Sequence, residues 1–165
     1  IILDSLTELI KGAQIEELPE RISDLLEKLK SAEKQISEFK TARALEQAKD
    51  LVDKRKSFGG FDAIVSEFTS GINADDLRTI ALDLRKKIGD GVVTLISKSE
   101  DKVSIVTTVG SKGRDSGIKA NEIVQAAALV LGGKGGGKED FAQGSGTNIQ
   151  KIKETISTIE NFLNT

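Results

Sequence analysis

A glycine-rich segment with two lysines has the residue types and spacing best suited to ligand chemistry. Residues 132–146 read GGKGGGKEDFAQGSG. Gly132 to Lys138 match the G-x-x-x-x-G-K part of a phosphate-binding loop, but Glu139 follows where that loop needs Ser or Thr. A helix is also predicted before the segment, where the loop needs a strand, so nucleotide hydrolysis is not expected. A flexible backbone with exposed N–H groups, flanked by Lys134 and Lys138, can still approach a phosphate closely.

Other noticeable residues have simpler interpretations. The adjacent acids Asp75-Asp76 and Glu139-Asp140 fit a helix cap and a loop. Phe141 more often anchors a glycine loop to a core than it stacks on a base. Arg85-Lys86-Lys87 fits a solvated helix end, with contact to a partner as the alternative. The glycines of 132–146 have a structural alternative as well, which is that they serve only tight turns.

The composition excludes several kinds of catalytic and metal site. The 165 residues include no His and no Cys. Ser-His-Asp and Cys-His catalysis are therefore excluded, as are zinc or haem sites built on imidazole or thiolate. No enzymatic activity is expected of this chain. No apolar run approaches the roughly 20 residues that a membrane span needs, so no membrane partner is expected.

Binding to a polyanion would have to use a local patch. The chain carries 24 basic and 26 acidic side chains, a formal net charge of −2. The one locally positive window is 110–138, in which five basic residues face only Asp115 and Glu122 as acids. The basic residues of this window are Lys112, Arg114, Lys119, Lys134 and Lys138.

The first third of the chain has the pattern of amphipathic helices. A short helix is predicted over 1–12 and a second over 18–57, with Pro19 at its first position. Apolar residues of the second helix alternate between spacings of three and four, which indicates a coiled-coil seam: Ile22, Leu25, Leu29, Ala32, Ile36 and Phe39. The pattern shifts phase after Phe39, which predicts a kink or a further helix. A basic last turn followed by Phe58-Gly59-Gly60 predicts a hinge.

The rest of the chain alternates between strand and helix patterns. Strands are expected at 61–68, 92–96 and 103–109, helices at 74–88, 120–131 and 148–163, and a polar loop at 110–119. A crossover between the first two strands and a hairpin between the next two predict a mixed sheet. The predicted fold class is α/β, with an N-terminal helical or coiled-coil arm over 1–57 and a small mixed-sheet α/β domain over 58–165.

Two segments together resemble one protein family. The sequence GIKANEIVQAAALVL at 117–131, followed by the glycine-rich segment, is similar to the C-terminal part of bacterial alanyl-tRNA synthetases. In those enzymes the corresponding loop has the form GGKGGG-basic-x-D-x-AQ. The sequence LPERISDLLEKLKSAEKQI at 18–36 resembles their linker helix. The order and spacing match over essentially the whole chain.

The resemblance implies that this chain is a piece of a longer enzyme. Residues 1–12 look like the closing edge of an editing domain, 18–57 like a helical linker and 58–165 like a DHH-associated C-terminal domain. The implied role is non-catalytic: to hold the outer corner of the tRNA and to couple aminoacylation with editing. The residues assigned to RNA binding are Lys112, Arg114, Lys119, Lys134, Gly135, Gly136, Gly137, Lys138 and Gln143.

The implied partners are tRNA-Ala and the remaining domains of the same synthetase. A homodimer with little RNA contact is the alternative. The parent is expected to be a cytoplasmic alanine–tRNA ligase that uses ATP, magnesium and an editing-site zinc, with no cofactor bound by this piece. Related DHH phosphoesterases end the glycine motif in His, where Lys138 stands here, so phosphoesterase activity is not expected.

Overall fold

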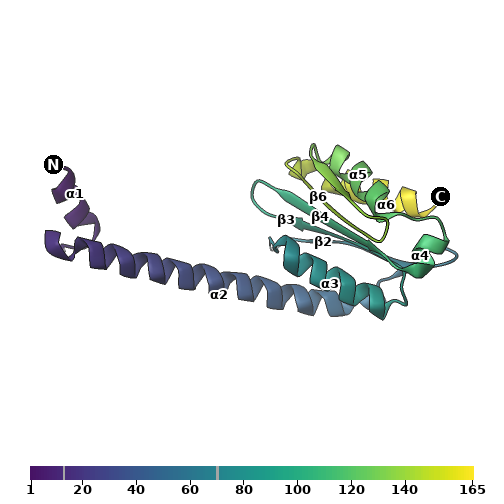
Figure 1. Cartoon of the computed structure of the whole chain (residues 1–165), viewed down its shortest axis with the longest axis horizontal. Helices are drawn as coiled ribbons and strands as arrows, with labels where there is room; N and C mark the ends of the chain where they lie inside the picture. Colours follow the sequence, from purple (N-terminus) through teal and green to yellow (C-terminus); the bar gives the residue numbers. More distant parts are fainter. Residues whose placement is uncertain (13, 70) are drawn as a thin grey trace. The chain divides into compact units, whose positions relative to one another are not determined.

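The computed structural model describes residues 1–12, 14–69 and 71–165 (Figure 1). They form two compact units, residues 1–39 and residues 40–165. None of the helices among the described residues has both the length and the apolar content that a membrane span requires.

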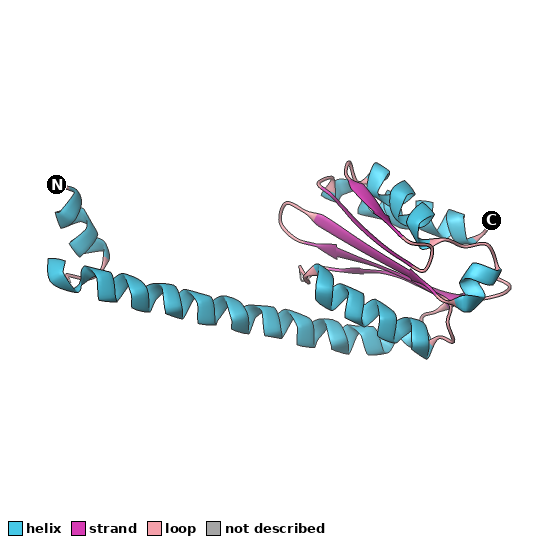
Figure 2. Cartoon of the chain, in the orientation of Figure 1, coloured by secondary structure: helices cyan, strands magenta, loops and turns pink. Residues whose placement is uncertain are grey.

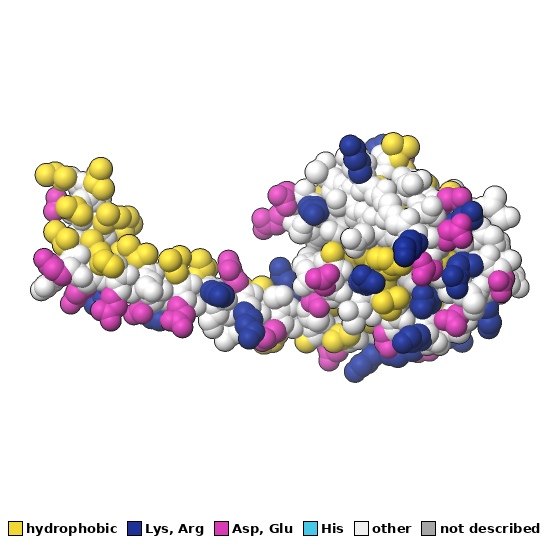
Figure 3. Space-filling view, in the orientation of Figure 1, with side chains coloured by type: hydrophobic (Ala, Val, Ile, Leu, Met, Phe, Trp, Pro, Cys, Tyr) yellow, Lys and Arg dark blue, Asp and Glu magenta, His cyan; other side chains and the backbone are white. Residues whose placement is uncertain are grey.

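The described residues of the first unit are mainly helical. α1 spans Ile2–Leu9, and the short 3-10 turn Ile15–Glu17 precedes α2, which spans Leu18–Asp53. The predicted seam lies on α2, and its large side chains are exposed, from 41% at Ile22 to 79% at Phe39. Figure 3 shows hydrophobic side chains gathered along α1 and the first part of α2. Within this unit, the described residues leave this apolar surface exposed.

α2 is one continuous helix, so the kink or division predicted after Phe39 is wrong. Ala44, Ala48 and Leu51 near its end are buried in a cluster with residues of the sheet. The phase shift marks a change in which face of the helix is buried. The compact unit that contains the sheet consequently starts at Lys40, upstream of the start predicted at Phe58.

The second unit is built on a six-stranded sheet with the order β1-β2-β3-β4-β6-β5. Its strands are Lys56–Ser57 (β1), Asp62–Phe68 (β2), Val92–Lys98 (β3), Val103–Val109 (β4), Lys134–Gly137 (β5) and Phe141–Gly146 (β6). β2 and β3 are parallel, and every other pair is antiparallel. This mixed sheet, seen edge-on in Figure 2, confirms the predicted α/β fold class.

Helices cover both faces of the sheet (Figure 1). α3 (Ala74–Lys87) and the end of α2 pack on one face, in a cluster that includes Leu77, Leu84 and Val93. α5 (Ala120–Val130) and α6 (Ile152–Leu163) pack on the other, in a cluster that includes Ile123. α3 begins as predicted, because the Asn73 side chain accepts a hydrogen bond of 2.8 Å from the Asp76 N–H.

Two predicted connections differ from the structure. The polar loop at 110–119 contains a short helix, α4 (Ser111–Asp115). The segment predicted to be a hinge is the turn of the β1–β2 hairpin: the Phe58 N–H donates to the Phe61 carbonyl at 2.9 Å, and the two rings stack with centroids 5.8 Å apart. Gly59 has a φ of 86°, a conformation that favours glycine, so this Gly pair serves a tight turn inside the domain.

Candidate nucleic-acid interface

The glycine-rich segment forms a β-hairpin, and the prediction of a flexible loop is wrong. β5 and β6 pair from Lys134 opposite Ser145 to Gly137 opposite Ala142. The Lys138 N–H donates to the Phe141 carbonyl at 2.8 Å and closes the turn between them. β5 is the last strand of the sheet, so the hairpin presents one open edge.

Close packing explains most of the glycines in this hairpin. A Cβ at Gly135 would lie 2.5 Å from Cγ1 of Val124 in α5, and a Cβ at Gly144 would lie 3.0 Å from the same atom. At Gly133 and Gly146 a Cβ would lie 1.8 Å and 2.3 Å from a main-chain carbonyl oxygen. The helix and the neighbouring strand therefore approach the backbone too closely for a side chain at these four positions.

Gly136 is different, because a Cβ there would meet nothing within 4 Å. Successive residues of a strand point to opposite faces, so Gly136 faces away from α5 when Gly135 faces toward it. Gln143 lies directly opposite Gly136 on β6, and Lys134 lies two residues earlier on the same face. The side chains of Lys134 and Gln143 are exposed. Packing therefore does not require a glycine at position 136. This glycine leaves an open patch of main chain beside the Lys134 amine and the Gln143 amide.

α3 brings a first arginine to this side of the hairpin. Gln143 is paired with Val106 of β4, so the two side chains lie on the same face of the sheet. Val106 is buried in the cluster that α3 covers. Phe141 lies on the same face at the start of β6, and the guanidinium carbon of Arg78 lies 4.5 Å from the centre of its ring. The Phe141 ring is partly buried against the α3 cluster, as the anchor interpretation predicts. Its outer side carries a stacked cation.

A second arginine of α3 contacts the neighbouring strand. Arg85 Nη1 donates to Thr108 Oγ1 at 2.8 Å, and that hydroxyl donates to the Asp140 carbonyl at 3.3 Å. The Arg85 side chain is only 21% exposed and pairs with Asp90 at 3.8 Å, so its interpretation as part of a solvated helix end is wrong. The sequence pattern around Arg78 indicates no role for it. The seven-residue spacing of the two arginines could have indicated that they share one face of a helix.

Lys119 lies beside the turn of the hairpin but already has an acidic partner. Its Nζ is 3.0 Å from Glu139 Oε1. The hydrogen bond to Glu139 raises the pKa of the Lys119 amine above its ordinary value, the charge of Glu139 raises it further, and Glu122 adds to the effect. The Ala120 N–H also donates to the Glu139 carbonyl, at 2.9 Å. This pair ties the start of α5 to the hairpin turn.

The remaining predicted residues fall into two places. Gly135, Gly136 and Gly137 lie on the hairpin with Lys134 and Gln143, and Lys138 follows in its exposed turn. Lys112 and Arg114 lie on α4, where Lys112 lines a shallow hollow with Gly60 and Ile88. Figure 3 shows Lys and Arg side chains along α3 and around the hairpin, with Asp and Glu among them. No group of three or more acidic side chains in the described part of the chain is placed to hold a metal ion.

A family match covers most of this sheet domain, from the turn after β1 to the end of the chain. Residues 60–165 match the DHHA1 domain. The chain belongs to the DHHA1 domain family. In this DHHA1 domain, the matched residues include the glycine hairpin, α3 with both arginines, and α5.

Relatives extend the similarity beyond the DHHA1 domain to the helical residues before it. The chain is 41% identical over 165 residues, 98% of its length, to the alanine–tRNA ligase of Streptomyces avermitilis. It is 36% identical over 150 residues, 91% of its length, to that of Alkaliphilus oremlandii. It spans only 18% and 17% of the length of these two relatives.

A solved structure from an alanyl-tRNA synthetase is similar to this chain as well. The C-Ala domain from Aquifex aeolicus alanyl-tRNA synthetase matches with a TM-score of 0.61 and 29% identity, covering 67% of this chain and 98% of that domain. Together these matches confirm the predicted resemblance to the C-terminal region of alanyl-tRNA synthetases.

Proposed function

We propose that this chain is a non-catalytic tRNA-binding and linker module of an alanine–tRNA ligase. Its partners are tRNA-Ala and the remaining domains of the same cytoplasmic enzyme. Those domains hold the ATP, magnesium and zinc that the reactions of the whole enzyme require. The DHHA1 domain binds RNA on the face of the hairpin that carries Gly136.

The observation that carries this proposal is the open main chain at Gly136 between polar and basic neighbours. A phosphate can approach a strand closely where no side chain stands, and Lys134 and Gln143 on that face supply a cation and an amide donor. The Lys138 N–H points to β6, so alternation along the strand directs the N–H of Gly135 toward the open edge. Contact through phosphates and shape suits a chain that has only six Phe as its aromatic residues.

Arg78 extends this surface onto α3. Its guanidinium is held against the Phe141 ring, and stacking of this kind leaves the N–H edges of the planar group available for a bidentate contact with a phosphate. An arginine fixed in this way loses less conformational entropy on binding than a freely rotating lysine.

The test measures binding of tRNA-Ala to the full chain over a range of salt concentrations. The double variant Lys134→Glu with Lys138→Glu is compared with Lys112→Glu with Arg114→Glu, which makes the same change in net charge on α4. We expect the hairpin variant to bind more weakly and its salt slope to fall by roughly 0.7–0.9 per lost contact. An unchanged hairpin variant would remove the hairpin as the RNA-binding face, and a loss in the α4 variant would show that Lys112 and Arg114 contact RNA as well.

A second candidate function is homodimerisation through α2. Its support is the exposed seam, whose heptad spacing is typical of a coiled coil. The molecular mass in solution, with and without tRNA-Ala, separates the two functions. A dimer without RNA that becomes monomeric in Leu25→Glu with Leu29→Glu, together with negligible tRNA binding, would favour this second function.

A further inference from the structure

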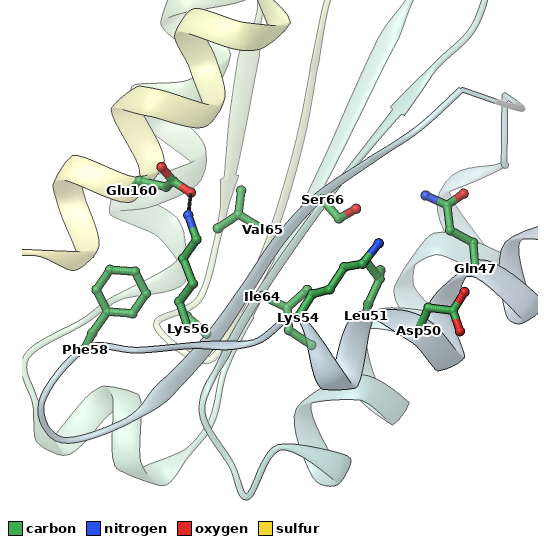
Figure 4. A pocket seen from close by; sticks show the side chains of 11 residues that line it. Gln47, Asp50, Leu51, Lys54, Lys56, Phe58, Ile64, Val65, Ser66 and Glu160 are labelled. Carbon is green, nitrogen blue, oxygen red and sulfur yellow. Dashed lines mark hydrogen bonds and ion pairs between the residues drawn. The ribbon is translucent and has the colours of Figure 1, made fainter.

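A groove runs along the edge of the sheet opposite the hairpin. It has a volume of about 330 Å³ and is lined by the end of α2, by residues 63–66 of β2 and by Glu160 of α6 (Figure 4). Among the described strands, β1 is the neighbour of β2 on this edge, and it pairs only with Asp62 and Ala63. The rest of β2 therefore borders the groove without a neighbouring strand.

The main chain of β2 directs hydrogen-bonding groups into this gap. The Phe61 carbonyl accepts from the Phe58 N–H at 2.9 Å, and the Glu67 carbonyl accepts from Gln47 Nε2 at 3.2 Å, so both carbonyls face this edge. Main-chain groups alternate along a strand, so the N–H and C=O of Val65 and the N–H of Glu67 face it as well. These three groups are a template for another extended chain.

Charged side chains line the groove but cancel one another. Lys56 Nζ is 2.7 Å from Glu160 Oε1, which closes the side next to α6. Lys54 extends from the end of α2 along the groove in Figure 4, and Asp50 lies one helical turn before it. Two lysines and two acids leave the lining without net charge. A polyphosphate chain is therefore a poor occupant, in contrast to the hairpin face.

We propose that this groove binds an extended segment of another polypeptide, which adds to the sheet beside β2. The segment lies in line with β1, beyond Lys56. Its main chain supplies acceptors for the N–H groups of Val65 and Glu67 and a donor for the Val65 carbonyl. The segment can extend no further than Glu67, because the Gln47 side chain already donates a hydrogen bond to the Glu67 carbonyl. Phe58 and Leu51 in the walls favour apolar side chains at alternate positions of the segment.

The experiment selects short random peptides by phage display on the full chain and measures their affinity for two matched variants. Val65→Pro removes an outward N–H and places a ring on the edge, whereas the hydrogen bonds to β3 remain because alternate residues make them. Val65→Ala removes the same side chain and keeps the N–H. We expect selected peptides to bind Val65→Pro at least about tenfold more weakly than Val65→Ala, the effect of a lost main-chain hydrogen bond and a steric clash.

A second pair keeps the test decisive if Val65→Pro fails to fold by circular dichroism. Glu67→Pro and Glu67→Ala make the same comparison near the far end of the groove. In the parent, peptide should slow hydrogen exchange at the Val65 and Glu67 amides. Failure to select any peptide whose affinity depends on these N–H groups would overturn the proposal, as would equal binding to the Pro and Ala variants.

The experiment also distinguishes a second copy of the chain from another polypeptide. A doubled mass in solution that Val65→Pro abolishes and Val65→Ala retains would assign the groove to self-association and overturn the proposal. Binding of tRNA-Ala should be unchanged in all four variants, because the groove and the hairpin lie on opposite edges of the sheet. A failure of one proposal is therefore separable from a failure of the other.

Discussion

Arg78 of α3 is stacked on Phe141, the first residue of β6, with 4.5 Å between the guanidinium carbon and the ring centre. The stack joins the helix on one face of the sheet to the strand that carries Gln143. It places a cation on the face of the sheet that carries Gln143, the residue opposite Gly136.

Replacement of this arginine should weaken RNA binding more than it weakens the fold. We expect Arg78→Ala to reduce the salt slope of tRNA-Ala binding by about 0.7–0.9, the value for one lost phosphate contact. Loss of the stack should lower the free energy of unfolding by only about 0.5–1 kcal/mol. Lys87→Ala is the matched control, because it removes one positive charge from α3 at a residue paired with Asp83. An equal change of slope in both variants would argue against a specific contact at Arg78.

A side chain at position 136 should separate stability from binding. Gly136→Val adds a residue with high strand propensity where nothing lies within 4 Å of the new Cβ. We expect the free energy of unfolding in urea to rise by about 0.5–1 kcal/mol, because glycine costs the strand that much. Affinity for tRNA-Ala should fall, since the side chain holds the RNA backbone away. Unchanged affinity would show that RNA does not approach this main chain.

The neighbouring glycine should respond in the opposite way. A Cβ at position 135 would lie 2.5 Å from Val124 Cγ1, so Gly135→Ala forces α5 and the hairpin apart. We expect the free energy of unfolding to fall by roughly 1–3 kcal/mol, the usual cost of overpacking. Urea denaturation of Gly135→Ala beside Gly136→Ala measures the difference directly. Similar stabilities for the two variants would contradict the packing explanation.

The pair between Lys119 and Glu139 should lose its contribution to stability in alkaline solution. The folded pKa of Lys119 lies above its ordinary value of 10.5, so the pair contributes fully below pH 10.5 and its contribution is lost as pH rises through the folded pKa. We expect Glu139→Gln to move the Lys119 pKa back toward 10.5 in an NMR titration. Stabilities of parent and variant should converge at strongly alkaline pH. A Lys119 pKa that is the same in both would exclude Glu139 as the cause.

Truncation should locate the start of the stable domain. Ala44, Ala48 and Leu51 are buried in the sheet cluster, so a fragment of residues 40–165 retains that core and a fragment of 58–165 does not. We expect the shorter fragment to be less stable by roughly 3 kcal/mol, from the loss of a buried Leu and two Ala. Limited proteolysis of the full chain should leave a core that begins near Lys40. A persistent core that begins near Phe58 would show that the end of α2 contributes little.

The sequence predicts best those elements that have a regular apolar pattern. Six elements lie close to their predicted ranges: β2, β3, β4, α3, α5 and α6. Their apolar residues follow a regular spacing, and the fold buries the same residues that the spacing indicates. The end of α2 has a less regular pattern. Ala44 and Ala48 give a weak apolar signal, and only the sheet beneath them shows why that face is buried.

The hairpin and its arginines depend on contacts that no local pattern shows. Glycine has little intrinsic preference for strands, and Gly135 becomes part of one because Val124 and β6 fit against a backbone without side chains. Likewise, Arg78 lies far from Phe141 in the sequence, and only the fold brings the two together. The assignment of Lys112 and Arg114 to RNA binding stays a prediction, and its test is the α4 double variant.

The contact between Val124 and Gly135 implies that a side chain at position 135 requires a smaller residue at position 124. The methyl group of Val124 fills the space that a side chain at 135 would occupy. Val124→Ala empties that space, so a chain that carries both Val124→Ala and Gly135→Ala should tolerate the second substitution far better than the parent does. We therefore expect homologues with a larger residue at the position of Gly135 to have a smaller residue at the position of Val124. The two substitutions would compensate for each other between the hairpin and α5.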